Sequence, residues 1–121
     1  VSYKERVINR AMAERFGAHL EALGEEVRDP PATGGVGSSD YGNLSQVVPA
    51  IHPYVRIVGE DVSAHTAEFA AAAASEAGLR AMELAARCLA RTGHDLLTDG
   101  ELLARARREF EETVLARSGA A

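Results

Sequence analysis

Apolar residues recur every three or four positions near the start of the chain, which is the spacing of an amphipathic helix. Charged side chains occupy the intervening positions over residues 3–24, so one face is apolar and the other polar. Gly24 follows the last periodic residue and is typical of a helix C-terminus. The pattern predicts a first helix over residues 3–24. Its apolar positions are Val7, Ile8, Met12, Phe16, Leu20 and Leu23.

The following stretch, residues 28–43, has no regular pattern of apolar positions. It contains Pro30-Pro31, Gly34-Gly35 and Gly37, which interrupt helices and strands alike. We therefore predict a loop. A loop of this length is often functional.

Residues 45–58 are rich in β-forming side chains, and Pro49 and Pro53 interrupt the run. This composition predicts two short strands, followed by a turn or loop at residues 59–64. The apolar residues of the two strands are Val47, Val48, Ile51, Val55, Ile57 and Val58.

Helical spacing returns near Ser75, a candidate N-cap that is followed by an acidic residue in the first turn. A second helix is predicted from there to Thr92, with Gly93 as its stop. A third helix is predicted from Glu101 to about Ala116. The second helix carries an apolar stripe of Leu79, Met82, Ala86 and Leu89, with Ala85 and Cys88 beside it. The third carries Leu102, Leu103, Ala106, Phe110 and Val114 on one face, with Asp99 or Thr98 as its cap.

The order of elements is helix, loop, strands, helix and helix, which is typical of part of an α/β domain in which helices pack on a few strands. Two short strands make a poor sheet on their own. We therefore expect the rest of the sheet to come from polypeptide outside these 121 residues. The first residue is Val1 rather than Met. We accordingly expect the chain to begin inside a longer reading frame, or to have lost its start.

Composition and charge narrow the class of function. The net charge is −5 and the pI is about 5.3, without a basic cluster of the kind that binds nucleic acid. No leader and no apolar run of about 20 residues is present, so we expect a cytoplasmic protein without membrane or nucleic-acid partners. The single cysteine, Cys88, cannot form an internal disulfide. It is expected to be a small buried apolar group.

The segment Gly37-Ser38-Ser39-Asp40-Tyr41-Gly42-Asn43 is the first candidate for chemistry. A Gly/Ser-rich loop of this kind presents backbone N–H groups and hydroxyls to an anion such as a carboxylate. The alternative is a structural Asx-turn loop, in which Ser39 or Asp40 caps a short helix. Residue types alone leave both interpretations open.

The histidines are the second candidate. His65 follows a short loop and precedes a helical run, a suitable position for a metal ligand. The alternative is a surface or capping residue, and no paired-His or CxxC motif supports the ligand. His52 is either a core histidine or a substrate contact. His19 is expected on the surface of the first helix, and His94 near the C-terminus of the second.

Two motifs together resemble a known family. The stretch from Gly37 to Asn43 continues into Val47-Val48-Pro49-Ala50-Ile51-His52-Pro53, and His65-Thr66-Ala67-Glu68-Phe69 follows. This sequence resembles the C-terminal catalytic segment of the aminoacylase and carboxypeptidase-G type metallopeptidases. These form the metallopeptidase M-twenty family, and the closest likeness is to its aminobenzoyl-glutamate hydrolase and aminoacylase-like dipeptidase branch.

The resemblance implies a role for each matched residue. His65 matches the last ligand of a two-ion zinc or manganese site. Ser38, Ser39 and Asp40 match a loop beside the active site that positions substrate. Asn43 and His52 match positions typical of this branch, and we assign them to substrate binding. The implied reaction is amide hydrolysis by metal-activated water.

The resemblance also implies what is missing. In that family the other metal ligands and the catalytic Glu lie in the N-terminal half of the catalytic domain, and a dimerising lid domain separates the two halves. Residues 1–121 of this chain therefore resemble the C-terminal half of a three-layer α/β/α zinc-peptidase catalytic domain. One matched His does not complete a metal site. We therefore expect a fragment of a metal-dependent amidohydrolase that acts on a dipeptide, N-acyl amino acid or aminobenzoyl-glutamate-like substrate. The fragment alone is expected to be inactive, and the whole enzyme is expected to be a homo-oligomer. The alternative is a small stand-alone helical interaction or dimerisation domain.

Overall fold

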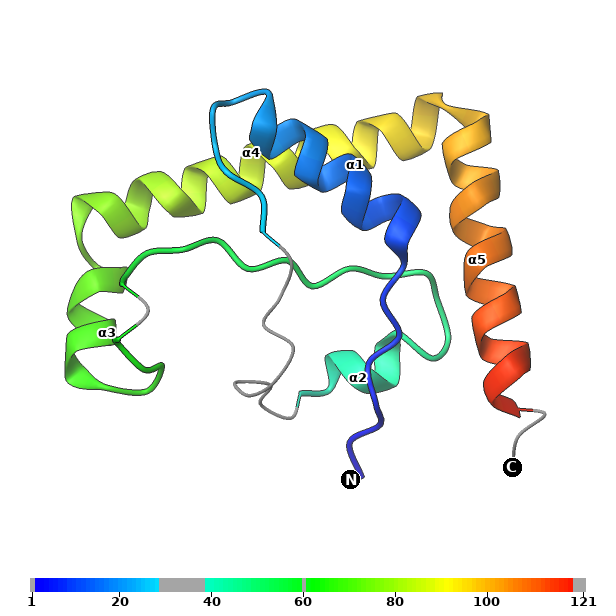
Figure 1. Ribbon diagram of the computed structural model, residues 1–121, viewed down its shortest axis with the longest axis horizontal. Coiled ribbons are helices and arrows are strands. Elements are labelled where there is room, and N and C mark those ends of the chain that lie inside the picture. The colour runs from blue at the N-terminus through cyan, green and yellow to red at the C-terminus, as the bar shows by residue number, and fades with distance from the viewer. Residues whose placement is uncertain (1, 29–38, 60, 119–121) are drawn as a thin grey trace.

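The computed structural model describes residues 2–28, 39–59 and 61–118, and this part of the chain contains five helices and no strand. The long helix α4 (Glu76–Thr98) and α5 (Gly100–Ser118) meet at a sharp corner (Figure 1). Helix α1 (Arg10–Glu21) packs against both of them. Two short helices, α2 (Tyr41–Leu44) and α3 (Ala67–Ala73), lie below α4 in that view.

The predicted α/β fold, with helices packed on strands, is wrong for the described residues. The first part of the predicted strand region turns tightly after α2, and the rest runs extended beneath α4 (Figure 1). Along residues 51–57 the side chains alternate between half-buried and exposed, which is the period of a strand. The described residues place no neighbouring strand beside this segment, so no sheet forms. The half-buried positions are Ile51, Pro53, Val55 and Ile57, and the exposed ones are His52, Tyr54 and Arg56.

The first helix begins later than its apolar spacing predicts. Asn9, and not residue 3, is the N-cap of α1, because its side-chain Oδ1 accepts a hydrogen bond from Met12 N at 3.1 Å. An asparagine in this position satisfies one of the free N–H groups of the first turn. The expected C-terminus is close to correct: the helix ends at Glu21, and Gly24 follows with φ of +88°.

A carboxylate from α5 caps the remaining N–H groups of α1. Glu109 accepts from Arg10 N at 2.7 Å and from Ala11 N at 2.9 Å. The Asn9 side-chain amide donates to Ala106 O at 2.8 Å. A negative charge at a helix N-terminus is also favoured by the helix dipole. The hydrogen bonds of Glu109 and Asn9 thus form a clamp that fixes α1 on α5. The buried apolar residues beside it include Ala11, Leu102 and Ala106.

Residues 2–8 form an extended N-terminal strap over α2. Three side chains of the segment around α2 bind strap backbone: Lys4 N donates to Asn43 Oδ1 at 2.8 Å, Val7 N donates to the Ser45 hydroxyl at 2.9 Å, and the Gln46 amide donates to Glu5 O at 2.6 Å.

The strap passes so close to Gly42 that a Cβ there would lie 2.0 Å from the Lys4 carbonyl oxygen. Only glycine permits this approach.

Helix α4 starts as predicted and ends later. The Ser75 hydroxyl accepts from Gly78 N at 3.2 Å and caps it. The helix continues through Gly93 to Thr98, since a glycine weakens a helix without ending it. Asp99 then caps α5, with Oδ1 accepting from Glu101 N and Leu102 N, each at 3.0 Å.

The predicted apolar stripe of α4 does not enter a core. The side of α4 that faces α1 instead buries Cys88, fully enclosed as expected, and Thr92. Leu79, Met82 and Leu89 remain 53%, 65% and 47% exposed. The other face of the helix therefore carries an uncovered apolar surface within the part of the chain that is described.

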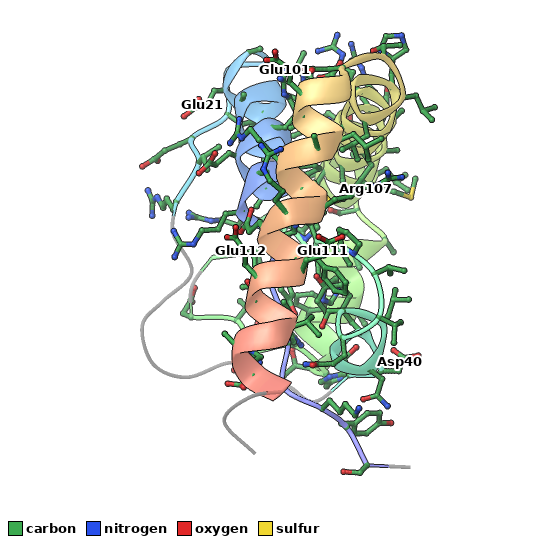
Figure 2. All side chains as sticks on the ribbon, turned by 90° about the vertical axis from the view of Figure 1, so that its right-hand side faces the viewer. Glu21, Asp40, Glu101, Arg107, Glu111 and Glu112 are labelled. Atoms are coloured by element: carbon green, nitrogen blue, oxygen red, sulfur yellow. The ribbon has the colours of Figure 1, made fainter. Side chains whose placement is uncertain are left out.

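Helix α5 has the predicted amphipathic character. Leu102 and Ala106 are buried toward α1. Figure 2 looks onto its outer side, where Arg107, Glu111 and Glu112 project. Among the described residues, no helix is both long and apolar enough to cross a membrane.

Candidate substrate-binding site

The Gly/Ser loop ends in a short helix, as one of the two interpretations predicted. The Ser39 hydroxyl accepts from Tyr41 N at 3.2 Å and lies 3.4 Å from Asp40 Oδ1. Asp40 occupies the N-cap of α2 without a side-chain hydrogen bond to its backbone, and its side chain is exposed near the lower end of the molecule in Figure 2. Gly37 and Ser38 lie outside the described residues.

Asn43 uses both ends of its side-chain amide on the N-terminal strap. Oδ1 accepts from Lys4 N, and Nδ2 donates to Ser2 O at 3.3 Å. Ser45 is fully buried, accepts from Val7 N and donates to Gly42 O at 2.8 Å. These two residues hold α2 in place beneath the strap.

His52 lies beside this loop although it belongs to a different segment. Its ring centroid is 4.9 Å from that of Tyr41 and 5.1 Å from that of Tyr54, with both pairs tilted. These are ordinary separations for interacting aromatic rings. Arg6 of the strap donates from Nη1 to the Tyr54 hydroxyl at 3.2 Å. The structure thus brings the substrate-binding candidate His52 together with Tyr41, next to Asp40.

The Tyr41 hydroxyl is buried and has no hydrogen-bond partner in the described part of the chain. Burial raises the pKa of this phenol, and the positive charge of Arg6 lowers it by a smaller amount. Tyr41 therefore keeps its proton at neutral pH and is able to donate it in a hydrogen bond.

An open apolar groove of about 440 Å³ runs between residues 51–57 and the helices above them. His52 lines the groove and also contacts the rings of Tyr41 and Tyr54, so the groove is continuous with this aromatic cluster. Helix α4 contributes Ala81, Met82, Ala85 and Leu89 to the opposite wall. Apolar side chains of this kind suit an apolar group of a ligand.

His65 lies elsewhere in the fold, immediately before the N-cap of α3, and Figure 1 shows α3 at one end of the molecule, apart from α2. Its side chain is exposed and its φ is +65°, a left-handed conformation that is uncommon for residues other than glycine. The next residue, Thr66, caps α3 by accepting from Phe69 N at 3.1 Å.

In the residues that the structure describes, no three His, Cys, Asp or Glu side chains are grouped so as to hold a metal ion. His65 has no co-ligand there, so these residues do not by themselves fit a zinc or manganese site.

Sequence reasoning missed a polar cluster between α1 and the end of α4. His19, expected on the surface, is only 18% exposed, and its Nε2 lies 2.8 Å from Asp95 Oδ2. Arg15 approaches the same carboxylate at 3.4 Å, and His94 lies 3.6 Å from its other oxygen. Burial acts to raise the pKa of Asp95, but these hydrogen bonds and charges outweigh it and lower the pKa. His19 and Asp95 are 76 positions apart, so helical spacing could not reveal their contact.

The Tyr41, His52 and Tyr54 cluster was also missed, although part of its signal was present. Tyr41 lies within the Gly/Ser motif, and Tyr54 follows His52 by two positions, which places both on one side of an extended segment. Only the fold shows that Arg6, 48 positions from Tyr54, joins them.

Two curated relatives are similar to this chain over most of its length. It is 35% identical over 111 residues to the Xaa-Arg dipeptidase of Mus musculus, covering 90% of this chain and 26% of that protein. It is 34% identical over 105 residues to the Xaa-Arg dipeptidase of Homo sapiens, covering 85% of this chain and 24% of that protein. The chain thus spans about a quarter of the length of these relatives. No family model and no solved structure matches it. The two likenesses support a relationship to peptidases.

Proposed function

We propose that this chain is part of a longer metal-dependent amidohydrolase that hydrolyses a dipeptide, an N-acyl amino acid or an aminobenzoyl-glutamate-like substrate in the cytoplasm. The observation that carries this proposal is the similarity to two dipeptidases along 90% and 85% of the chain. The names of those relatives favour a dipeptide with a C-terminal arginine as the substrate.

The residues of this chain divide between two tasks in the proposed enzyme. Ser39, Asp40, Asn43 and His52 belong to the part that binds the substrate, and Asn43 also holds their loop under the strap. Ser38 belongs to the same loop by sequence. His65 supplies one ligand to zinc or manganese, and the other ligands come from polypeptide outside these residues. That polypeptide is the principal partner, and it is expected to cover the exposed apolar face of α4. The whole enzyme is expected to form homo-oligomers.

The test compares the full-length protein with the 121-residue chain. Both are loaded with zinc or manganese, assayed for metal content, and incubated with alanyl-arginine and alanyl-leucine. We expect hydrolysis by the full-length protein only. Loss of a residue that only supports a metal ligand costs roughly 10- to 100-fold in activity. His65→Ala in the full-length protein, which removes a ligand itself, should cost at least as much and should lower the metal content per chain. Exposed His94 provides the matched control, His94→Ala. Equal activity in the two variants would overturn the assignment of His65.

A second candidate is a non-catalytic interaction domain that dimerises through α4. The exposed Leu79, Met82 and Leu89 favour it, because a soluble monomer rarely leaves such a stripe uncovered. Sedimentation of the 121-residue chain distinguishes the candidates. A defined dimer that becomes a monomer in Met82→Glu supports this second function. A folded monomer, or concentration-dependent aggregation without a defined dimer, contradicts it.

A further inference from the structure

We propose that Ser45 is a positioning residue for substrate binding, because its buried hydroxyl fixes the loop that carries Ser39 and Asp40 against the N-terminal strap. This inference rests on the proposed function, which places Ser39 and Asp40 in the part that binds the substrate. It goes further by naming the side chain on which the position of that loop depends. Ser45 itself was not among the residues expected to take part in substrate binding.

The hydroxyl of Ser45 links two segments that are 38 positions apart in the chain. It accepts a hydrogen bond from Val7 N at 2.9 Å and donates one to Gly42 O at 2.8 Å, and the residue is fully buried. A buried hydroxyl destabilises a protein unless it forms hydrogen bonds, and here it is used both as donor and as acceptor. Removal of the oxygen would also take this acceptor from the buried Val7, which costs more than the loss of an exposed bond.

The strap is firmly held at the point where Ser45 binds it. Val7 is buried, and so is Asn9, which belongs to the clamp between α1 and α5. The bonds that Asn43 and Gln46 make to the strap lie further from this clamp and are exposed. Water competes for an exposed hydrogen bond more effectively than for a buried one. Ser45 is therefore the residue through which the helical framework holds α2.

Helix α2 passes the position of Ser45 on to the residues proposed to bind substrate. Ser45 is the C-cap of this helix and Asp40 is its N-cap. Ser45 N donates to Tyr41 O at 2.9 Å, and N–H groups of α2 donate to Ser39 O and Asp40 O. A helix of a single turn is not stable by itself, so the contacts at its ends set its orientation. The ring of Tyr41 also lies 4.9 Å from that of His52, so the loop and His52 are positioned together.

Loss of the Ser45 hydroxyl is expected to weaken substrate binding rather than slow the chemical step. A loop that is no longer fixed occupies its binding-competent position for only part of the time, and the apparent affinity falls by that fraction. Once the substrate is bound, the same contacts form, so kcat should change little. A hydroxyl with a purely structural role would instead lower stability and leave the KM of the folded protein unchanged.

The test compares the metal-loaded full-length protein with its Ser45→Ala variant. Hydrolysis of alanyl-arginine should show a KM about tenfold higher with little change in kcat, the factor that corresponds to about one buried hydrogen bond. Amide hydrogen exchange at residues 42–45 should become faster, while exchange in α4 and α5 stays the same. Calorimetry with arginine, a product that has no amide bond to hydrolyse, should show a higher Kd. Ser45→Thr retains the hydroxyl and should restore these values toward those of the wild type.

Thr92→Val is the matched control. Its hydroxyl is also buried and donates to Cys88 O at 2.8 Å, but this bond lies within α4. The control should therefore leave KM and the exchange at residues 42–45 unchanged. If Ser45→Ala does not fold, Ser45→Cys takes its place, because a thiol is similar in shape to a hydroxyl and forms weaker hydrogen bonds.

Two results would overturn the positioning role of Ser45 even if the wild type cleaves dipeptides: unchanged exchange at residues 42–45, or faster exchange with an unchanged KM. A wild type that cleaves no dipeptide would refute the proposed function. In that case the positioning role is retained if Ser45→Ala weakens the binding of arginine and is refuted if it does not.

Discussion

Gly42→Ala is predicted to destabilise the fold strongly, because the N-terminal strap leaves no space for a methyl group. A Cβ at Gly42 would lie 2.0 Å from the Lys4 carbonyl oxygen, roughly 1.5 Å inside ordinary van der Waals contact. The strap or α2 must move by about that distance. The three shortest hydrogen bonds between the strap and the segment around α2, made by Asn43, Ser45 and Gln46, would be broken or distorted.

At about 1 kcal/mol for each of these bonds, the loss of unfolding free energy should be about 3 kcal/mol. Gly93→Ala is the matched control, since Gly93 lies inside α4 and a Cβ there meets nothing within 4 Å. It should stabilise the protein by up to about 1 kcal/mol through helix propensity. Urea unfolding followed by far-ultraviolet circular dichroism measures both. If Gly42→Ala unfolds at the same urea concentration as the parent chain, the close contact between strap and α2 is refuted.

Three further predictions concern single side chains. Glu109→Ala should lower the unfolding free energy by about 2 kcal/mol in urea unfolding, because Arg10 N and Ala11 N lose a charged acceptor; an effect no larger than that of exposed Glu112→Ala would contradict the cap. The pKa of Asp95 is lower in the folded protein than its unfolded value near 3.9, so its carboxylate adds stability above that pH, and this stability is lost as the pH falls through the folded pKa. Asp95→Asn should therefore flatten the acid side of a curve of unfolding free energy against pH. A variant curve that runs parallel to that of the parent chain would refute this. His65→Gly should raise the melting temperature slightly by relieving a positive φ worth about 1 kcal/mol; a lower melting temperature would show that the histidine side chain stabilises the turn.

The sequence predicted the starts of α4 and α5, which depend on neighbouring residues. Ser75 and Asp99 cap α4 and α5 through N–H groups two or three positions ahead. The apolar face of α5 and the burial of Cys88 were likewise correct. Each of these features depends on spacing within one helix, and periodicity records that directly.

The errors arose where distant contacts decide the conformation. Residues 3–8 have helical spacing, but side chains about 40 positions away bind their backbone and hold them extended. Residues 51–57 have the alternation of a strand, yet a strand needs a partner, and the described residues provide none. The stripe of Leu79 and Met82 was predicted as apolar and is exposed, because periodicity shows that a face is apolar but not what covers it.

The candidate site was predicted in part. The sequence singled out Asp40, Asn43 and His52, and the structure places His52 against Tyr41 next to Asp40. Arg6 had no local signal, since its approach to Tyr54 depends on the path of the strap. No assignment of metal co-ligands for His65 was possible from these residues, and the structure adds none among those it describes.

The clamp between α1 and α5 has a consequence for how the chain folds during synthesis. Glu109 lies 98 and 99 positions after the two N–H groups that it caps, Asn9 binds Ala106 across 97 positions, and Glu5 pairs with Arg117 across 112. Contacts of such separation cost loop-closure entropy before they form and slow folding. On the ribosome, α1 leaves the exit tunnel long before Glu109 is translated. During that interval Ala11 and Phe16 lack their final environment, and exposed apolar surface of this kind favours association of unfinished chains with one another.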